Sequence, residues 1–282
     1  MQQNKKKQWY RLAFGAGLLI LLCCLGIYAA GSINGKQEVP DGPVLCFVRT
    51  QDDADCILIR GSENAVLIDT GEAQDADHIL EILRQYQVER LDAMILTHPD
   101  KDHIGGAGRI SREITVEQVI EPYYTLENER LDALHSLFSA QKVPVQTAEN
   151  VTKLSFVDFA LTVYPAQEKE YKKDNNYSLA VLFAYQDSHA LFTGDAMKKR
   201  IQELMEVEWP GVDLLKVPYH GRYTKGEEEF LMQLAPEYAV VTAAEAEPEV
   251  QEALSRTGAG IWNTREDDVT FMADGNSFFY LE

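Results

Sequence analysis

Short apolar runs, separated by polar turn residues, dominate the chain after residue 43 and predict a series of strands. In this first half the runs are 44–48, 56–59, 65–68 and 93–96. The last of them is apolar throughout, which is typical of a strand buried on both faces. Residues 77–86 instead carry apolar side chains at helical spacing, and residues 97–108 are predicted to form a loop.

The second half repeats this layout of strands followed by helices. Strands are predicted at 155–163, 178–184, 190–192, 213–217, 238–241 and within 260–281, and helices at 198–207, 227–233 and 250–256. Two groups of strands, each followed by helices, indicate an α/β fold in which two sheets pack face to face with helices outside.

The N-terminus carries a different pattern. A basic cluster at Lys5, Lys6, Lys7 and Arg11 precedes an uncharged apolar run over residues 12–30 that is long enough to cross a bilayer. We predict an uncleaved signal-anchor, with a cleaved signal peptide as the alternative. The anchor gives a single-pass cell-membrane protein and cleavage gives a secreted one. The predicted parts are 1–31 for the basic segment and anchor, 32–43 for a linker and 44–282 for an extracytoplasmic domain.

The net charge bears on the possible partners of the chain, and the cysteines bear on its possible disulfides. The formal net charge of −19 disfavours long nucleic acid as a partner, because phosphate binding depends on Lys and Arg, although a local basic patch stays compatible with it. Cys46 and Cys56 flank a short polar loop between two predicted strands. They either pair across a hairpin in an oxidising compartment or stay as buried thiols.

Candidate chemistry gathers directly after the strand at 93–96. His98, Asp100, Asp102 and His103 offer two imidazoles and two carboxylates within six positions, at a strand end where active sites form. These ligands suit zinc, and a carboxylate-rich set also suits manganese as the alternative. The competing interpretation is a polar loop that caps a helix through Asp102.

Two later residues follow strands in the same way. Asp195 ends an apolar run, where its carboxylate either bridges two metal ions or caps the helix that follows. His220 lies just past the strand at 213–217 and is either a metal ligand or an ordinary loop histidine.

Together these segments resemble the metallo-β-lactamase superfamily, and more narrowly the extracytoplasmic hydrolase domain of the ComEC-like competence proteins and its free-standing relatives. The matching segments are 67–71 (LIDTG), 97–103 (THPDKDH), 193–195 (TGD) and 216–221 (KVPYHG). The resemblance implies a four-layer αβ/βα sandwich over residues 44–282 with a site for two divalent metal ions. It implies His98 and Asp100 on one ion, Asp102, His103 and His220 on the other, Asp195 bridging them, and Asp69 orienting the ligand loop.

The chain departs from the wider superfamily at several positions. Asp100 stands where β-lactamases carry His, which argues against antibiotic hydrolysis. Asn176 lies where other members have a further His, Tyr219 replaces the first of a His pair, and residues 243–248 lack the His-Pro pair of many relatives. The resemblance therefore predicts metal binding more firmly than it predicts the substrate.

The function that we expect is hydrolysis of a phosphodiester outside the cytoplasm by metal-activated water, with Asp100 or Asp102 orienting that water. Tyr219, Arg222, Tyr223 and Asn176 are candidate substrate contacts. The substrate is expected to be a small phosphodiester or a surface polymer. The alternatives are hydrolysis of another ester, amide or lactone, and a membrane-tethered binding protein without turnover.

Overall fold

A computed structural model describes residues 42–281 of the chain. The basic segment, the predicted anchor or signal peptide and all but the end of the predicted linker lie outside these residues. Between residues 42 and 281, no helix combines the length and apolar content needed to span a bilayer.

The first sheet has eight strands in the order β17-β16-β1-β2-β3-β5-β7-β8. Strands from β17 to β3 pair antiparallel, and β3, β5, β7 and β8 are parallel. The bounds are β1 (Val44–Phe47), β2 (Ile57–Arg60), β3 (Ala65–Ile68), β5 (Ala93–Ile95), β7 (Val119–Pro122), β8 (Val145–Ala148), β16 (Val269–Ala273) and β17 (Phe278–Leu281).

The second sheet has seven strands in the order β15-β14-β13-β12-β11-β10-β9, with β12 to β15 parallel. The bounds are β9 (Thr152–Ser155), β10 (Ala160–Tyr164), β11 (Ala180–Tyr185), β12 (Ser188–Phe192), β13 (Leu214–Lys216), β14 (Tyr238–Val241) and β15 (Gly260–Asn263). Two short strands, β4 (Arg90–Leu91) and β6 (Thr115–Val116), form a separate pair.

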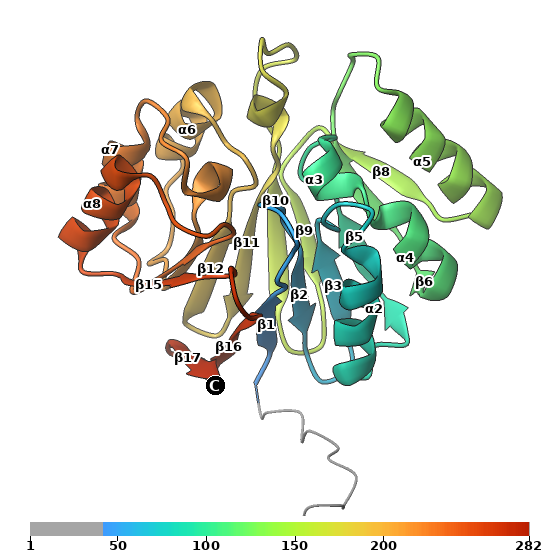
Figure 1. Ribbon diagram of the computed structural model, residues 1–282, viewed down its shortest axis with the longest axis horizontal. Coiled ribbons are helices and arrows are strands. Elements are labelled where there is room, and N and C mark those ends of the chain that lie inside the picture. Colours follow the sequence, from blue (N-terminus) through green and yellow to red (C-terminus); the bar gives the residue numbers. More distant parts are fainter. Residues whose placement is uncertain (1–41, 282) are drawn as a thin grey trace, which may run out of the picture. The chain divides into compact units, whose positions relative to one another are not determined.

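Helices cover the outer face of each sheet, as Figure 1 shows. The first sheet is covered by α2 (Ala76–Gln85), α4 (Ala107–Glu113) and α5 (Glu129–Gln141), and the second by α6 (Lys198–Met205), α7 (Glu227–Leu234) and α8 (Pro248–Thr257). Three short helical turns lie in loops: α3 (Lys101–Ile104), η1 (Asp174–Tyr177) and η2 (Pro218–Gly221).

Three apolar layers hold this sandwich together, one between the sheets and one between each sheet and its helices. Strand β3 illustrates how one run serves two layers. Val66 and Ile68 pack into the layer between the sheets, while Ala65 and Leu67 face α2 and α4. Successive side chains of a strand point to opposite faces, so a continuous apolar run buries both. The predicted αβ/βα sandwich is confirmed.

Three details differ from the sequence predictions or settle an open alternative. The predicted loop 97–108 contains the turn α3, which positions Asp102 and His103. The predicted strand 155–163 is a hairpin, because the amide of Phe156 bonds the carbonyl of Phe159 at 2.9 Å and reverses the chain. Among the described residues, Cys46 and Cys56 form no disulfide; both are buried, and burial raises the pKa of the Cys46 thiol to about 12.

Candidate metal centre

The candidate site lies at one edge of both sheets, where loops leave the carboxyl ends of parallel strands. Asp69 follows β3, His98 follows β5, Asp195 follows β12 and His220 follows β13. Carboxyl ends of parallel strands open onto a common edge, so residues far apart in the chain meet there. The convergence expected from the sequence is present in the structure.

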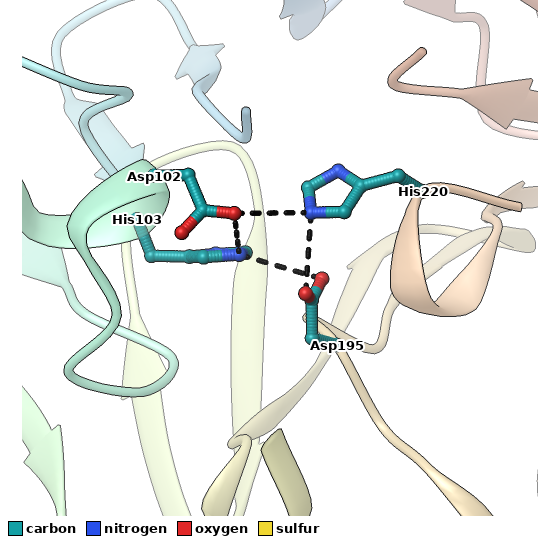
Figure 2. A group of neighbouring side chains, drawn as sticks. All are labelled: Asp102, His103, Asp195 and His220. Atoms are coloured by element: carbon teal, nitrogen blue, oxygen red, sulfur yellow. Dashed lines mark ion pairs between the residues drawn. The ribbon is translucent and has the colours of Figure 1, made fainter. Parts of the chain in front are cut away.

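Four side chains form the centre of this site, as Figure 2 shows. Asp102, His103, Asp195 and His220 each offer a ligand atom, and these atoms all lie within 4.8 Å of one another. Nε2 of His220 lies 3.2 Å from Asp195 Oδ2 and 3.5 Å from Asp102 Oδ2. Nε2 of His103 lies 3.4 Å from Asp195 Oδ1 and 3.8 Å from Asp102 Oδ2.

The chemistry of these atoms fits a divalent cation. Nε2 of His103, Nε2 of His220 and Oδ1 of Asp195 are buried, and none has a hydrogen-bond partner among the described residues. Buried polar atoms without partners are rare in folded proteins because they lose their bonds to water. Three such atoms aimed at one point, with the carboxylate of Asp102 beside them, match the nitrogen and oxygen ligands of zinc and manganese.

His98 and Asp100 lie beside this centre and extend it. Nε2 of His98 is buried without a hydrogen-bond partner among residues 42–281 and lies 3.5 Å from Asp100 Oδ2. The rings of His98 and His103 are in contact, with centroids 4.0 Å apart. This third imidazole and third carboxylate make the group a potential site for two ions.

Asp69 fixes the orientation of His103. Oδ2 of Asp69 lies 2.7 Å from His103 Nδ1, and its two oxygens also accept hydrogen bonds of 2.7 Å from the amide and hydroxyl of Thr97. An Nδ1–H bonded to a carboxylate leaves Nε2 as the free lone pair that faces the cluster. Asp69 adopts a positive φ of 56°, which places its side chain for these three contacts.

Backbone geometry places His220. Tyr219, His220 and Gly221 have successive φ values of 48°, 53° and 79°. Consecutive left-handed residues are uncommon and persist only where the surroundings hold them. Here the ring nitrogen Nδ1 lies 3.1 Å from the hydroxyl of Thr242, and a Cβ on Gly221 would approach Ala246 to 2.8 Å.

A buried ion pair between Lys216 and Asp55, which the sequence analysis does not predict, lies next to the ligand cluster. The ammonium group of Lys216 is buried, pairs with Oδ2 of Asp55, and donates to the carbonyl of Gly194 at 3.0 Å. It also lies 3.6 Å from Oδ1 of Asp195. Oδ1 of Asp55 in turn lies 3.3 Å from Nδ1 of His220. The signal in the sequence is a lysine within the otherwise apolar strand run 214–217.

Electrostatics make the centre favourable for positive charge. Burial opposes ionisation of Asp195, but His220 and His103 outweigh it and hold its pKa well below the usual range. The same two histidines lower the pKa of Asp102. Burial also opposes protonation of the histidines, yet Asp195, with Asp69 beside His103 and Asp55 beside His220, raises both pKa values well above normal. The ionised carboxylates thus attract positive charge, which a bound metal ion supplies in place of protons.

The remaining predicted residues lie around this centre. Asn176 is buried, and its side-chain oxygen accepts a hydrogen bond from the amide of Arg200. Its neighbour Asn175 instead reaches the cluster, donating to Asp195 Oδ2 at 3.2 Å. The short turn η1 determines which of the two amides faces the site, and the sequence does not reveal that choice.

The three predicted substrate contacts next to His220 lie on its loop. Arg222 packs over the ring of Tyr219, 5.5 Å from its centroid, and pairs with Asp53 at 3.1 Å. Tyr223 is exposed. Contact of these side chains with a substrate stays a prediction.

Comparison with known proteins identifies the superfamily of the chain. The family model described as the metallo-beta-lactamase superfamily matches residues 49–244. This chain belongs to that superfamily. The superfamily resemblance expected from the sequence is confirmed, and with it a metallo-β-lactamase-type hydrolase domain with a cluster of His and Asp side chains that could hold a metal ion.

Curated relatives support the narrower resemblance to the ComEC-like group. ComE operon protein 3 of Bacillus subtilis is 28% identical over 245 residues, which cover 79% of this chain and 30% of that protein. Competence protein ComA of Neisseria gonorrhoeae is 27% identical over 246 residues, covering 83% of this chain and 33% of that protein. The chain thus matches about a third or less of the length of these relatives.

A solved structure supports the fold. The metallo-beta-lactamase fold protein YhfI from Bacillus subtilis superposes with a TM-score of 0.57, covering 82% of this chain and all of that one, at 11% sequence identity. The two proteins therefore share a fold although few of their residues are identical. Because a shared fold does not fix the function, the chemistry has to be argued from the site itself.

Proposed function

We propose that this chain hydrolyses phosphodiester bonds with water activated by two divalent metal ions. The observation that carries the proposal is a set of buried ligand atoms on His98, His103, Asp195 and His220 that meet at one edge of the sandwich and have no hydrogen-bond partner within residues 42–281. Ions held there would lower the pKa of water from 15.7 to about 7 and offset charge on the entering and leaving oxygens of a phosphodiester. Zinc is the proposed metal, with manganese as the alternative.

In this proposal each residue of the site has an assigned role. His98 and Asp100 hold one ion, Asp102, His103 and His220 the other, and Asp195 lies between them. Asp100 and Asp102 are also the candidate groups that accept a proton from the attacking water, because both carboxylates are partly exposed at the mouth of the site.

Two buried contacts keep the ligands in place. Asp69 holds the tautomer of His103, and Lys216 offsets part of the negative charge of Asp195. Both therefore act through the ligands rather than on a substrate.

Three carboxylates, those of Asp100, Asp102 and Asp195, distinguish this ligand set from one of histidines alone. Asp100 supplies oxygen where β-lactamases have nitrogen, and oxygen ligands favour the harder ions that serve phosphoryl chemistry. This supports a phosphodiester over an amide or lactam substrate.

We place this activity outside the cytoplasm, in a domain that begins at about residue 44. The basic cluster at 5–11 and the apolar run at 12–30 support an N-terminal signal-anchor that leaves the domain on the far side of the membrane. Cleavage of the same segment would release it as a secreted enzyme.

The experiment uses the full chain, purified in detergent and supplied with Zn²⁺ or Mn²⁺. Activity on bis-p-nitrophenyl phosphate is compared with activity on p-nitrophenyl acetate and on a chromogenic β-lactam. We expect hydrolysis of the phosphodiester, and we expect Asp102→Asn to reduce it by more than about 100-fold, since even residues behind metal ligands cost 10–100-fold. Asp187→Asn is the matched control, because Asp187 is exposed in the β11–β12 turn.

Each other outcome contradicts the proposal in a distinct way. Hydrolysis of the acetate or the lactam alone would identify a different hydrolase on the same fold. Metal binding without turnover of any of the three substrates would favour a membrane-tethered binding protein.

A further inference from the structure

A small polar pocket of about 130 Å³ lies at the same edge of the sandwich as the metal-ligand cluster of Asp102, His103, Asp195 and His220 (below, the metal cluster). Three loops form it: the one after β1, the one after β14 and the one after β15. Its lining residues are Arg49, Thr50, Gln51, Asp52, Asp53, Thr242, Ala243, Ala244, Thr264 and Arg265. None of them belongs to the proposed metal ligands.

The pocket and the metal cluster share a wall. Thr242 lines the pocket, and its hydroxyl lies 3.1 Å from Nδ1 of His220, whose Nε2 faces the cluster. On another side, Asp53 lines the pocket and pairs with Arg222 of the His220 loop. The His220 loop therefore contacts the pocket on one side and the cluster on the other.

Two arginines give the pocket unused positive charge. Within residues 42–281, the guanidinium groups of Arg49 and Arg265 make no ion pair or hydrogen bond, although the chain carries 45 acidic residues against 26 basic ones. Of the two acidic residues in the lining, Asp53 is offset by Arg222, whereas Asp52 accepts a hydrogen bond from the neutral side-chain amide of Gln74 at 3.3 Å and keeps its charge. The two arginines therefore outweigh the one remaining carboxylate in the lining. Unpaired guanidinium groups favour phosphate, which they bind with two parallel hydrogen bonds.

The size of the pocket limits what it holds. A volume of about 130 Å³ is well below the roughly 300 Å³ of pockets for drug-sized ligands. It suits one small charged group, while the remainder of the molecule lies over the metal cluster.

From these observations we propose that this pocket, the Arg49–Arg265 pocket, binds a second phosphate group of the substrate. The inference rests on the proposed phosphodiesterase function and narrows it: the preferred substrate is a phosphodiester that carries a further phosphate, as a phosphorylated strand end does, rather than a bare diester.

The test compares the dinucleotides TpT, pTpT and TpTp as substrates of the metal-loaded full chain. The wild-type protein prefers one of the two phosphorylated dinucleotides over TpT, through a lower KM. Arg49→Gln combined with Arg265→Gln raises that KM by about tenfold or more and leaves kinetics on TpT and on bis-p-nitrophenyl phosphate unchanged. Arg130→Gln is the matched control, because Arg130 is exposed on α5 and its guanidinium also has no partner in the described part of the chain.

Two results would overturn the proposal. One is equal KM values for TpT and both phosphorylated dinucleotides in the wild type. The other is a preference that the double arginine variant retains. Both arginines are exposed, so thermal unfolding checks that the variants keep the wild-type fold.

Failure of the proposed function itself gives a different result. If none of the diesters is hydrolysed, calorimetric titration with pTpT, TpTp and TpT measures the pocket without turnover. Tighter binding of a phosphorylated dinucleotide that depends on Arg49 and Arg265 would support the pocket, and equal binding of all three would reject it.

Discussion

Lys216 and Asp55 form an ion pair in which neither side chain is exposed to solvent. The pair connects elements that are distant in sequence, since Lys216 ends β13 in one sheet and Asp55 precedes β2 in the other. The backbone of Asp55 adds two contacts, donating to the carbonyl of Asp102 at 3.1 Å and accepting from the amide of Gly71 at 2.8 Å. The pair thus joins both sheets directly behind the metal cluster.

The two charges of this pair should be coupled in their effect on the free energy of unfolding. Lys216→Met leaves the carboxylate of Asp55 buried without its cation, which costs about 3–5 kcal/mol of the free energy of unfolding. Asp55→Asn combined with Lys216→Met should cost less than the sum of the two single variants. Urea unfolding of the three variants and the wild type measures this, and strictly additive losses would show that the two charges do not interact.

Asp69→Asn should weaken metal binding without unfolding the chain. The amide cannot reproduce the contacts that Asp69 makes with His103 Nδ1 and Thr97, so His103 loses its fixed tautomer. We expect a 10–100-fold loss of affinity for Zn²⁺, as for other residues that orient metal ligands. Competition with a chelating dye provides the measurement, with Asp187→Asn as the control. An unchanged affinity would remove the orienting role from Asp69.

Glu227 should make the stability depend on pH. Burial is the largest influence on its carboxyl group and raises the pKa from 4.5 to about 8, with Glu247 adding to the effect. Between those two pH values the folded chain keeps a proton that the unfolded chain releases. The free energy of unfolding should therefore decrease as pH rises from about 4.5 to 8, by a few kcal/mol on the order of the shift, and level off above it.

Glu227→Gln tests that assignment. The neutral amide should flatten this part of the pH profile, whereas Glu229→Gln, an exposed carboxyl on the same helix, should leave it unchanged. A wild-type slope that survives in the Glu227→Gln variant would show that another group is responsible.

The metal-binding residues could be predicted because each follows a strand whose apolar run is visible in the sequence. His98, Asp195 and His220 are polar residues directly after such runs, and strand ends converge in this type of sandwich. Asp55 could not be found in this way. It lies in a polar loop beside Asp52 and Asp53, and only its partner Lys216, on the opposite sheet, distinguishes it from them.

The same limit applies to finer local geometry. Asn175 rather than Asn176 reaches Asp195, because a single short turn rotates adjacent side chains to different sides. The hairpin within 155–163 is not visible in the sequence, because its turn residues Val157 and Asp158 include no glycine or proline and Val157 continues the apolar run. A contact distant in sequence also reaches this turn, because the amide of Ser62 donates to Asp158.

The central claim is that His98, Asp100, Asp102, His103, Asp195 and His220 together bind divalent metal ions. Elemental analysis of the full chain, after incubation with Zn²⁺ or Mn²⁺ and removal of free metal, tests it most directly. We expect two ions per wild-type chain and a loss of at least one in the Asp195→Ala variant. A wild-type chain that retained neither metal, or an Asp195→Ala chain that retained both ions, would contradict the claim.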